Sequence, residues 1–165
     1  MASRLVYLAS VGDSVTAAHQ NEQPGGLIGR DSQVSNVGSI SPQATICSVT
    51  VTVGASREIL IQTCGQVSVN DNAKVSSGAI DDAHAPWFFA AIYNGGTLLN
   101  RHNYQCLAKG RETGFSLFVH DQPSSGSNTY NLVVGISGNS VPLVAIQASP
   151  TQQTLLYVSD VGPAF

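Results

Sequence analysis

Strict alternation of apolar and polar residues between Thr45 and Val69 is the feature that most constrains the fold of this chain. In the segment 47–53, Cys and Val occupy every second position with Ser and Thr between them, and the segment 59–69 repeats the pattern. A period of two is typical of a β-strand with one face on a core and the other in water, and β-branched residues favour strands. Because Gly54-Ala55-Ser56 separates the two segments, we expect them to form an antiparallel hairpin.

The rest of the chain shows the same kind of pattern in short segments separated by turn residues, and no convincing helix. An Asn94-Gly95-Gly96 turn follows the segment 87–93, whose apolar residues fall in both phases, so this strand should be buried on both faces. About eight strands of this spacing predict an all-β sandwich or barrel. The segments are 47–53, 59–69, 87–93, 97–106, 113–121, 129–137, 141–148 and 154–161, and the segment 30–40 is a candidate for a first edge strand.

Composition excludes several classes of partner. The 165 residues fit one domain, and 42% of them are apolar, as in a globular protein. Only 10% are charged, against roughly a quarter in a typical soluble domain, so hydroxyl and amide groups must form most of the surface. A net charge of −3 offers no basic footprint for nucleic acid, and no apolar run is long enough to cross a bilayer. We expect neither nucleic acid nor a membrane as partner.

Residues 1–29 differ from the sequence that follows, and we interpret them as an N-terminal arm before a domain of residues 30–165. They carry apolar side chains without a period that would seat them in a sheet, and Pro24-Gly25-Gly26 marks the junction. Ordering such a segment costs more backbone entropy than its few large apolar side chains return, so it needs hydrogen bonds from a neighbour's sheet edge. The residues expected to bind this partner are Arg4, Leu5, Val6, Tyr7, Leu8 and Val11.

Motifs for catalysis and for metal binding are weak. The segment 11–16, VGDSVT, resembles the first block of GDSL-type esterases, with Ser14 as the nucleophile, and Asp81 and His84 could be its partners. The strand–helix alternation that would hold such a triad is missing, so we expect no enzyme and no catalytic residue. The four His and three Cys lack metal spacing, so we expect reduced cysteines, no metal and no cofactor. Calcium at Asp81-Asp82 is the less favoured alternative to a solvated loop.

Several segments, in matching order, resemble a family of small phage virion structural proteins. VGDSVTAAHQNEQPGGLIG (residues 11–29) is similar to a conserved stretch near their start, and ICSVTVTVGASREILIQTCGQV (46–67) to their S-V-T-V-T-V-x-A-G-R-x-I segment. SSGSNTYNLV (124–133) and LLYVSDVGPAF (155–165) resemble their T-Y-x-L and L-x-V-E-D-I-G-P strands. The chain departs from the pattern at Ser159, where Glu is usual, and in the aromatic run from Trp87 to Phe89.

The resemblance implies an antiparallel jelly-roll β-sandwich of the tumour-necrosis-factor or complement-C1q type, commonly a trimer. The first hypothesis is a capsid decoration (cement) protein on the virion surface, which binds the major capsid protein or another virion protein through its arm. The alternative is a tail-fibre or receptor-binding head, in which Trp87, Phe88 and the loop from Asp71 to Asp82 would meet a host cell-surface glycan.

The expected homotrimer also has support from the segment 87–93. Its apolar residues exceed what the inner faces of a two-sheet sandwich can bury, and an exposed patch of that size would promote aggregation. We therefore expect a trimer interface that includes Trp87, Phe88, Phe89 and Tyr93, although a role for these rings in the core, or in stacking on a sugar, is also open.

Overall fold

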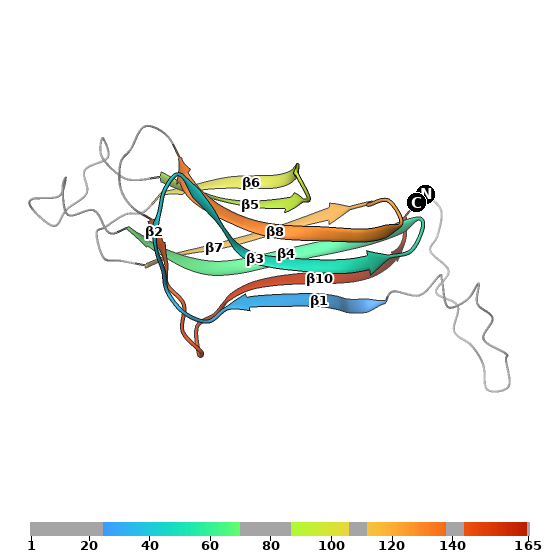
Figure 1. The fold of residues 1–165 in the computed structure, drawn as a ribbon, viewed down its shortest axis with the longest axis horizontal. Coiled ribbons are helices and arrows are strands. Elements are labelled where there is room, and N and C mark those ends of the chain that lie inside the picture. Colours follow the sequence, from blue (N-terminus) through green and yellow to red (C-terminus); the bar gives the residue numbers. More distant parts are fainter. Residues whose placement is uncertain (1–24, 70–86, 106–111, 138–143, 165) are drawn as a thin grey trace, which may run out of the picture.

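The computed structural model describes residues 25–69, 87–105, 112–137 and 144–164, which form ten β-strands and no helix (Figure 1). The first five strands lie within residues 26–94 and the last five within residues 97–163, and these are called the two halves of the chain below. Their bounds are β1 Gly26–Gln33, β2 Val37–Ile40, β3 Gln43–Val53, β4 Arg57–Val69, β5 Trp87–Asn94, β6 Thr97–Gln105, β7 Glu112–Asp121, β8 Gly126–Ser137, β9 Val144–Ile146 and β10 Thr154–Pro163.

Two antiparallel sheets pack face to face. In the first, β10 lies between β1 and β4, and β4 also pairs with β7 along its length and with the short β9, which pairs with β2. The second sheet has the order β3-β8-β5-β6. Apart from β2 and β9, strands from both halves of the chain alternate in each sheet, as in a double Greek key. The predicted antiparallel jelly-roll sandwich is therefore confirmed.

The predicted hairpin between the segments 47–53 and 59–69 is wrong. β3 pairs with β8, whereas β4 pairs with β10, β7 and β9, so the two strands lie in opposite sheets. The connection at Gly54-Ala55-Ser56 crosses the sandwich, with Ser56 at a φ of 54°. Two alternating strands give the same sequence pattern whether they pair side by side or face each other across a core, so the pattern could not distinguish the two arrangements.

The hairpin of β5 and β6 agrees with the prediction. Asn94 pairs with Thr97, and Gly95 between them adopts a φ of 55°, which glycine reaches without steric cost. All residues from Phe88 to Ile92 are buried, so β5 is covered on both faces as expected. The first strand begins at Gly26, four residues earlier than the predicted start of the domain.

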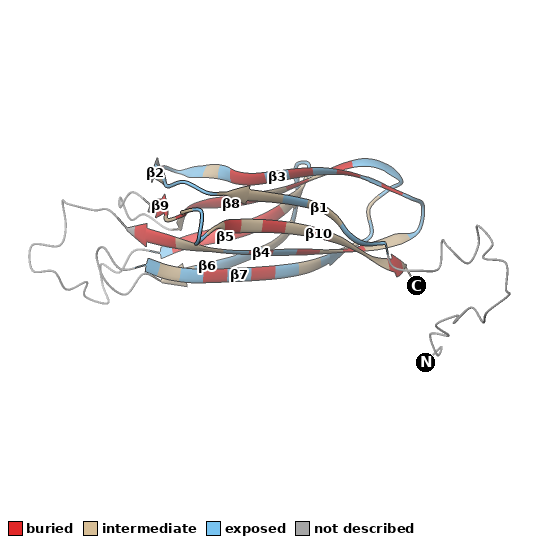
Figure 2. Ribbon diagram, turned by 90° about the horizontal axis from the view of Figure 1, so that it is seen from below, coloured by how far each residue is buried: buried red, intermediate tan, exposed pale blue. Residues whose placement is uncertain are grey.

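The core lies between the sheets. Buried and exposed residues alternate along β3 and β7, as Figure 2 shows. Inward side chains from both sheets form one apolar cluster, which includes Val49, Val51, Ile59, Ile61, Phe88, Ile92, Phe115, Tyr130, Leu132, Leu156 and Val158. At one edge of the sandwich, the backbone N–H of Ser48 on β3 donates to the Asp31 carboxylate on β1 over 2.8 Å, which ties the two sheets together there.

Candidate interaction surfaces

The outer face of the first sheet carries apolar side chains on four adjacent strands. Strand register places them in three cross-strand rows, because outward residues pair with outward residues. The rows are Leu27–Ser159–Leu60–His120, Arg30–Tyr157–Gln62–Phe118 and Ser32–Leu155–Cys64–Ser116. The apolar members of these rows are called the apolar face below: Leu27, Leu60, Cys64, Phe118, Leu155 and Tyr157.

Two side chains of the apolar face are highly exposed. Leu27 is 58% exposed and Phe118 is 67% exposed, the largest fraction among the exposed large hydrophobic residues that the structure describes. The Arg30 guanidinium lies 5.6 Å from the centre of the Tyr157 ring and donates a hydrogen bond to Gln153. The face therefore carries apolar side chains on each of its four strands, with Gln62 between Tyr157 and Phe118 and a cation at one side.

The outer face of β3 and β8 in the second sheet has the opposite chemistry. The Ser48 hydroxyl donates to the Asn131 amide oxygen over 2.8 Å, and the hydroxyls of Thr50 and Thr129 lie 2.9 Å apart in a hydrogen bond. Thr52 and Ser127 continue the same register. These six residues are called the polar face below, and four of them, Ser48, Asn131, Thr50 and Thr129, bond to one another in pairs.

A groove of about 450 Å³ runs between β6 and β7, the edge strands of the two sheets. The Tyr104 hydroxyl on β6 donates to the Ser116 carbonyl on β7 over 2.8 Å, and the Asn100 amide donates to the Phe118 carbonyl over 2.9 Å. Burial raises the pKa of Tyr104, so its hydroxyl stays a proton donor. The remaining lining residues are His102, Leu117 and Phe118.

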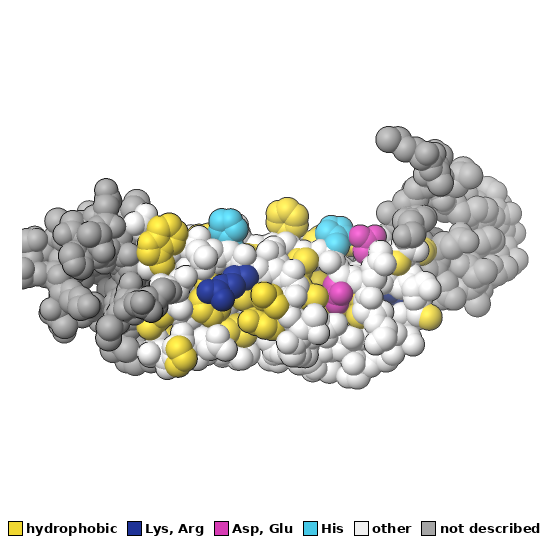
Figure 3. Space-filling model, turned by 90° about the horizontal axis from the view of Figure 1, so that it is seen from above, with side chains coloured by type: hydrophobic (Ala, Val, Ile, Leu, Met, Phe, Trp, Pro, Cys, Tyr) yellow, Lys and Arg dark blue, Asp and Glu magenta, His cyan; other side chains and the backbone are white. Residues whose placement is uncertain are grey.

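The side of the sandwich on which β6 lies is seen in Figure 3, where hydrophobic side chains and histidines protrude from a largely uncharged surface. The hydrogen bonds from Asn100 and Tyr104 of β6 go to backbone carbonyls on the free edge of β7, where no further strand within the described residues pairs with it. Bonds of this kind protect an edge strand from uncontrolled pairing. Hydrogen bonds from β6 to β7 therefore bridge the groove, and Phe118 belongs both to its lining and to the apolar face.

On the outer face of β5 and β8, a small apolar cluster contains Phe89, Ala91 and Val133, with Tyr93 packed against it. The Arg101 guanidinium covers this cluster at 3.9 Å from the centre of the Phe89 ring. Arg101 itself is exposed. Among the described residues, ion pairs join Arg57 to Asp160 and His120 to Glu58, and neither involves Arg101.

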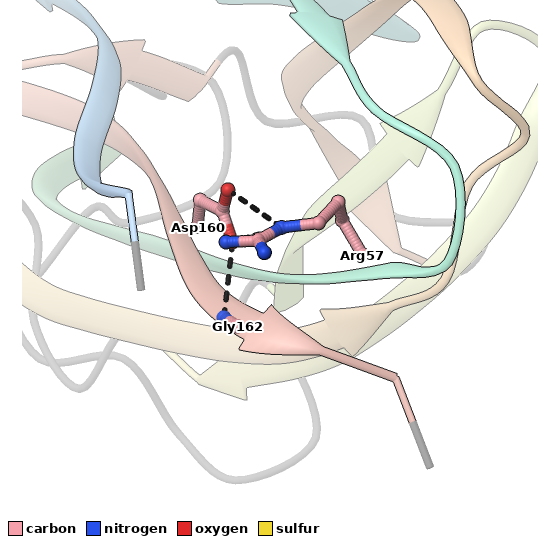
Figure 4. Close-up of polar contacts among 3 residues, drawn as sticks. All are labelled: Arg57, Asp160 and Gly162. Atoms are coloured by element: carbon pink, nitrogen blue, oxygen red, sulfur yellow. Dashed lines mark hydrogen bonds and ion pairs between the residues drawn. The ribbon is translucent and has the colours of Figure 1, made fainter. Parts of the chain in front are cut away.

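The Arg57–Asp160 pair lies at the end of the first sheet (Figure 4). Arg57 donates through Nη2 over 2.7 Å and through Nε over 3.0 Å, and its side chain and that of Asp160 are only 11% and 15% exposed. The Gly162 N–H donates to the same carboxylate over 3.0 Å. The Ala164 N–H donates to the Ser56 carbonyl, which holds the end of the chain against the β3–β4 connection.

The four aromatic residues predicted for a trimer interface do not form one patch. Trp87 is 43% exposed and Tyr93 is half-buried, whereas Phe89 is 4% exposed beneath Arg101. Phe88 is fully buried between the sheets, where its ring stacks on Tyr104 with centroids 5.2 Å apart. Phe88 is therefore a core residue and is not available to another subunit, because the inward phase of β5 belongs to the inter-sheet core.

The sequence contained a signal for the exposed apolar residues that the interface prediction missed. Phe118 occupies the outward phase of its strand between Ser116 and His120, where a polar residue is expected. Leu60, Leu155 and Tyr157 break the polar phase of β4 and β10 in the same way. A search for apolar residues in the outward phase would have located the apolar face.

Several predicted sites lie outside the described residues. These are the arm residues Arg4, Leu5, Val6, Tyr7, Leu8 and Val11, the esterase-like Ser14, Asp81 and His84, and the loop from Asp71 to Asp82. Within the described ranges, no three His, Cys, Asp or Glu side chains gather to hold a metal ion, Cys47 and Cys64 are free thiols, and no helix is long and apolar enough to cross a membrane.

Comparisons with known proteins match structures only, since no protein-family model and no curated sequence matches the chain. An insecticidal delta-endotoxin from Bacillus thuringiensis is 9% identical over 77% of this chain and 20% of its own, with a TM-score of 0.41. The sugar-binding C-terminal domain of EclA is 9% identical over 92% of this chain and 82% of its own, with a TM-score of 0.37. A structure of infectious bursal disease virus is 14% identical over 87% of this chain and 43% of its own, with a TM-score of 0.31.

The chain thus spans about a fifth of the length of the endotoxin and less than half of that of the viral protein. The matched structures are β-sandwich domains, and they include sugar-binding proteins and structures of infectious bursal disease virus. At these identities the likeness concerns the fold alone.

Proposed function

We propose that this chain is a structural protein of a bacteriophage particle, a capsid decoration (cement) protein without enzymatic activity that forms a homotrimer. Its N-terminal arm binds the major capsid protein or another virion protein, and the jelly-roll domain forms the outer part of the trimer. The apolar face is the observation that carries this proposal. Its exposed Leu and Phe side chains favour a covering partner in the working assembly, as a structural subunit has.

The apolar face is suited to contact with further copies of the chain. Leu27 and Phe118 lie on opposite edge strands of the sheet, and Leu60, Leu155 and Tyr157 lie on the two strands between them. Apart from Arg30, its three rows contain no Lys, Arg, Asp or Glu, and interface centres are depleted of charged residues. Burial of this face between subunits accounts for exposed Leu and Phe side chains in a chain with so few charges.

The residues that carry the resemblance to phage virion proteins also support the proposal. Arg57 belongs to the second resembling segment, and Asp160 and Gly162 to the last, about a hundred residues later. In the fold these three residues form one bonded group (Figure 4). The resembling segments thus share a structural role at the end of the sheet where β1 begins, since Gly25 lies against the Asp160 side chain.

Particle attachment tests this function directly. Deletion of residues 2–23 removes none of the ten strands, so the truncated chain should keep its fold, measured by circular dichroism, and its trimeric mass. It should no longer bind particles from which the protein has been stripped, whereas the full chain rebinds. Cryo-electron microscopy of the rebound particle then distinguishes the capsid from the tail. Rebinding by the truncated chain would contradict the role of the arm, and its failure to fold would show that the arm belongs to the core.

A further inference from the structure

The outer face of β5 and β6 places an exposed cation, an exposed aromatic ring and two amides together. Register pairs Trp87 with Gln105, Phe89 with Asn103 and Ala91 with Arg101, all in the outward phase. Arg101 extends from its own row over the ring of Phe89 in the next row. The row of Trp87 and Gln105 is the next one along the strand, about 6.6 Å from the row of Phe89, because two residues of strand separate them. These side chains, Trp87, Arg101, Asn103 and Gln105, are called the Arg101 site.

The Arg101 guanidinium lies over the Phe89 ring, 3.9 Å from its centre. The Phe89 ring beneath it is 4% exposed and lies over Gly135, where an added Cβ would meet the Phe89 ring at 2.7 Å. Gly135 therefore leaves room for a ring lying close to the sheet, and the ring gives the guanidinium a flat support. Stacking uses the face of a guanidinium and leaves its in-plane N–H donors for a ligand.

The chemistry of the donors specifies the ligand. A guanidinium fixed by stacking binds a carboxylate through two parallel hydrogen bonds, and no carboxylate of the described chain occupies it. The 43% exposed Trp87 offers a ring face to C–H groups, as a sugar ring provides. The amides of Asn103 and Gln105 can both donate to and accept from hydroxyl groups.

We propose that the Arg101 site binds a carboxylate-bearing saccharide, with Arg101 as the anchor for the carboxylate, Trp87 as the stacking surface, and Asn103 and Gln105 as hydrogen-bonding partners of hydroxyls. The site lies on the second sheet, away from the apolar face, so it stays accessible when the apolar face is covered. The saccharide class follows because Arg101 is the one cation on this face within the described residues, among neutral hydrogen-bonding groups, whereas an acidic protein segment would be matched by several cations.

The test compares matched acidic and neutral sugars on the full-length chain. Immobilised sialyllactose and a uronic-acid oligomer should bind, whereas lactose and the carboxyl-reduced oligomer should bind at least about tenfold more weakly, as expected for the loss of a charge-assisted hydrogen-bond pair. Trp87→Ala should weaken binding of the acidic sugars several-fold.

The Arg101→Lys variant keeps the charge and the aliphatic cover over Phe89 but loses the planar fork, so it should bind the acidic sugars about tenfold more weakly at unchanged melting temperature. Arg30→Gln, which removes one charge from the other sheet, is the control and should bind as the wild type does. Equal binding of acidic and neutral sugars, no binding of either acidic sugar, or wild-type binding by Arg101→Lys would each overturn the proposal. Binding to polyglutamate but to neither acidic sugar would assign the site to a protein partner instead. All of these outcomes are independent of attachment to the particle.

Discussion

The two sheets of the sandwich have similar inner faces and different outer faces. Inward positions of both are Val, Ile, Leu and Phe in one shared cluster. Outward, the β3–β8 pair shows hydroxyls and amides in direct hydrogen bonds, whereas the first sheet shows Leu, Tyr, Phe and Cys across four strands. The inner faces explain why the chain folds as a sandwich. The difference between the outer faces indicates which side the assembly covers.

The two sheets also differ in how their polar groups contribute to stability. On the polar face, exposed neutral pairs exchange hydrogen bonds with water for hydrogen bonds with each other, which has a small net effect. In the first sheet, the nearly buried Arg57–Asp160 pair joins β4 to β10 and also receives the Gly162 N–H. Removal of one partner there leaves a poorly hydrated charge, so the same kind of substitution should have very different costs on the two sheets.

The largest effect should come from Arg57→Met, which keeps much of the aliphatic volume and removes the guanidinium. It leaves the Asp160 carboxylate without its charge partner in a site only 15% exposed, so the free energy of unfolding should fall by about 3–5 kcal/mol. Urea denaturation measures the change. Arg30→Met, in an exposed position of the same sheet, is the control and should cost at most about 0.5 kcal/mol. A cost under about 1 kcal/mol for Arg57→Met would contradict this view of the pair.

A second effect concerns Cys47, on the inner side of β3. Burial, with a smaller contribution from the Asp31 charge, raises the pKa of this thiol to about 11, from 9.0 in an unfolded chain. The folded state therefore keeps a proton that the unfolded state releases, so the stabilisation is complete below about pH 9 and is lost as the pH rises towards 11. The loss should be on the order of 2 kcal/mol.

Urea denaturation of the wild type and of Cys47→Ala at about pH 8 and pH 10.5, with reductant, isolates this effect from the titration of tyrosines. The wild type should lose more stability than the variant over that interval. Parallel losses in the two proteins would show that the thiol titrates at the same pH in both states.

Much of the inner structure was predictable, because alternation identifies the inward residues of each strand. The inward set on β3 and β4, from Cys47 to Val67, is the one that the sequence pattern indicates. Strand pairing was not predictable in the same way: an alternating strand fits either a neighbour in its sheet or a partner across the core, which is why β3 and β4 were assigned to a hairpin. The contact between Arg57 and Asp160 joins residues 103 positions apart, and no local pattern encodes it.

The apolar face was predictable only in part. Phe118 was visible as an aromatic residue in a polar phase, but the other members of the face, such as Tyr157 and Leu60, come from strands whose order only the fold defines. The expected interface on β5 failed for Phe88 for a related reason. Apolar residues in both phases mean burial on both sides, and here a small cluster under Arg101 covers the outer side.

A third effect uses the exposed Cys64, on the inner strand β4 of the apolar face, as a reporter of coverage. If further subunits cover this face, alkylation of Cys64 should be at least about tenfold slower in the wild-type assembly than in a Leu60→Glu variant, since a buried charge disfavours the contact. Peptide mass spectrometry resolves Cys64 from the other thiols, and Cys47 should stay unlabelled in both folded proteins. Equal rates for Cys64 would mean that the face is open in solution.

The smallest effect is expected on the polar face. Thr50→Val removes a hydroxyl whose partner, Thr129, can turn to water, so the free energy of unfolding should change by no more than about 0.5 kcal/mol and the oligomeric state should not change. Urea denaturation and size-exclusion chromatography measure both. A cost above about 1.5 kcal/mol would remove the contrast between the two outer faces.

The molar mass in solution tests the central claim, that further copies of the chain cover the apolar face, most directly. Multi-angle light scattering on the full chain at micromolar concentration should give three times the 17.2 kDa of one chain. Phe118→Glu, which places a charge on the most exposed residue of the face, should give the mass of a single folded chain, while Thr50→Glu on the polar face should remain trimeric. A wild-type mass of one chain, or a trimer that survives Phe118→Glu and Leu60→Glu, would contradict the account.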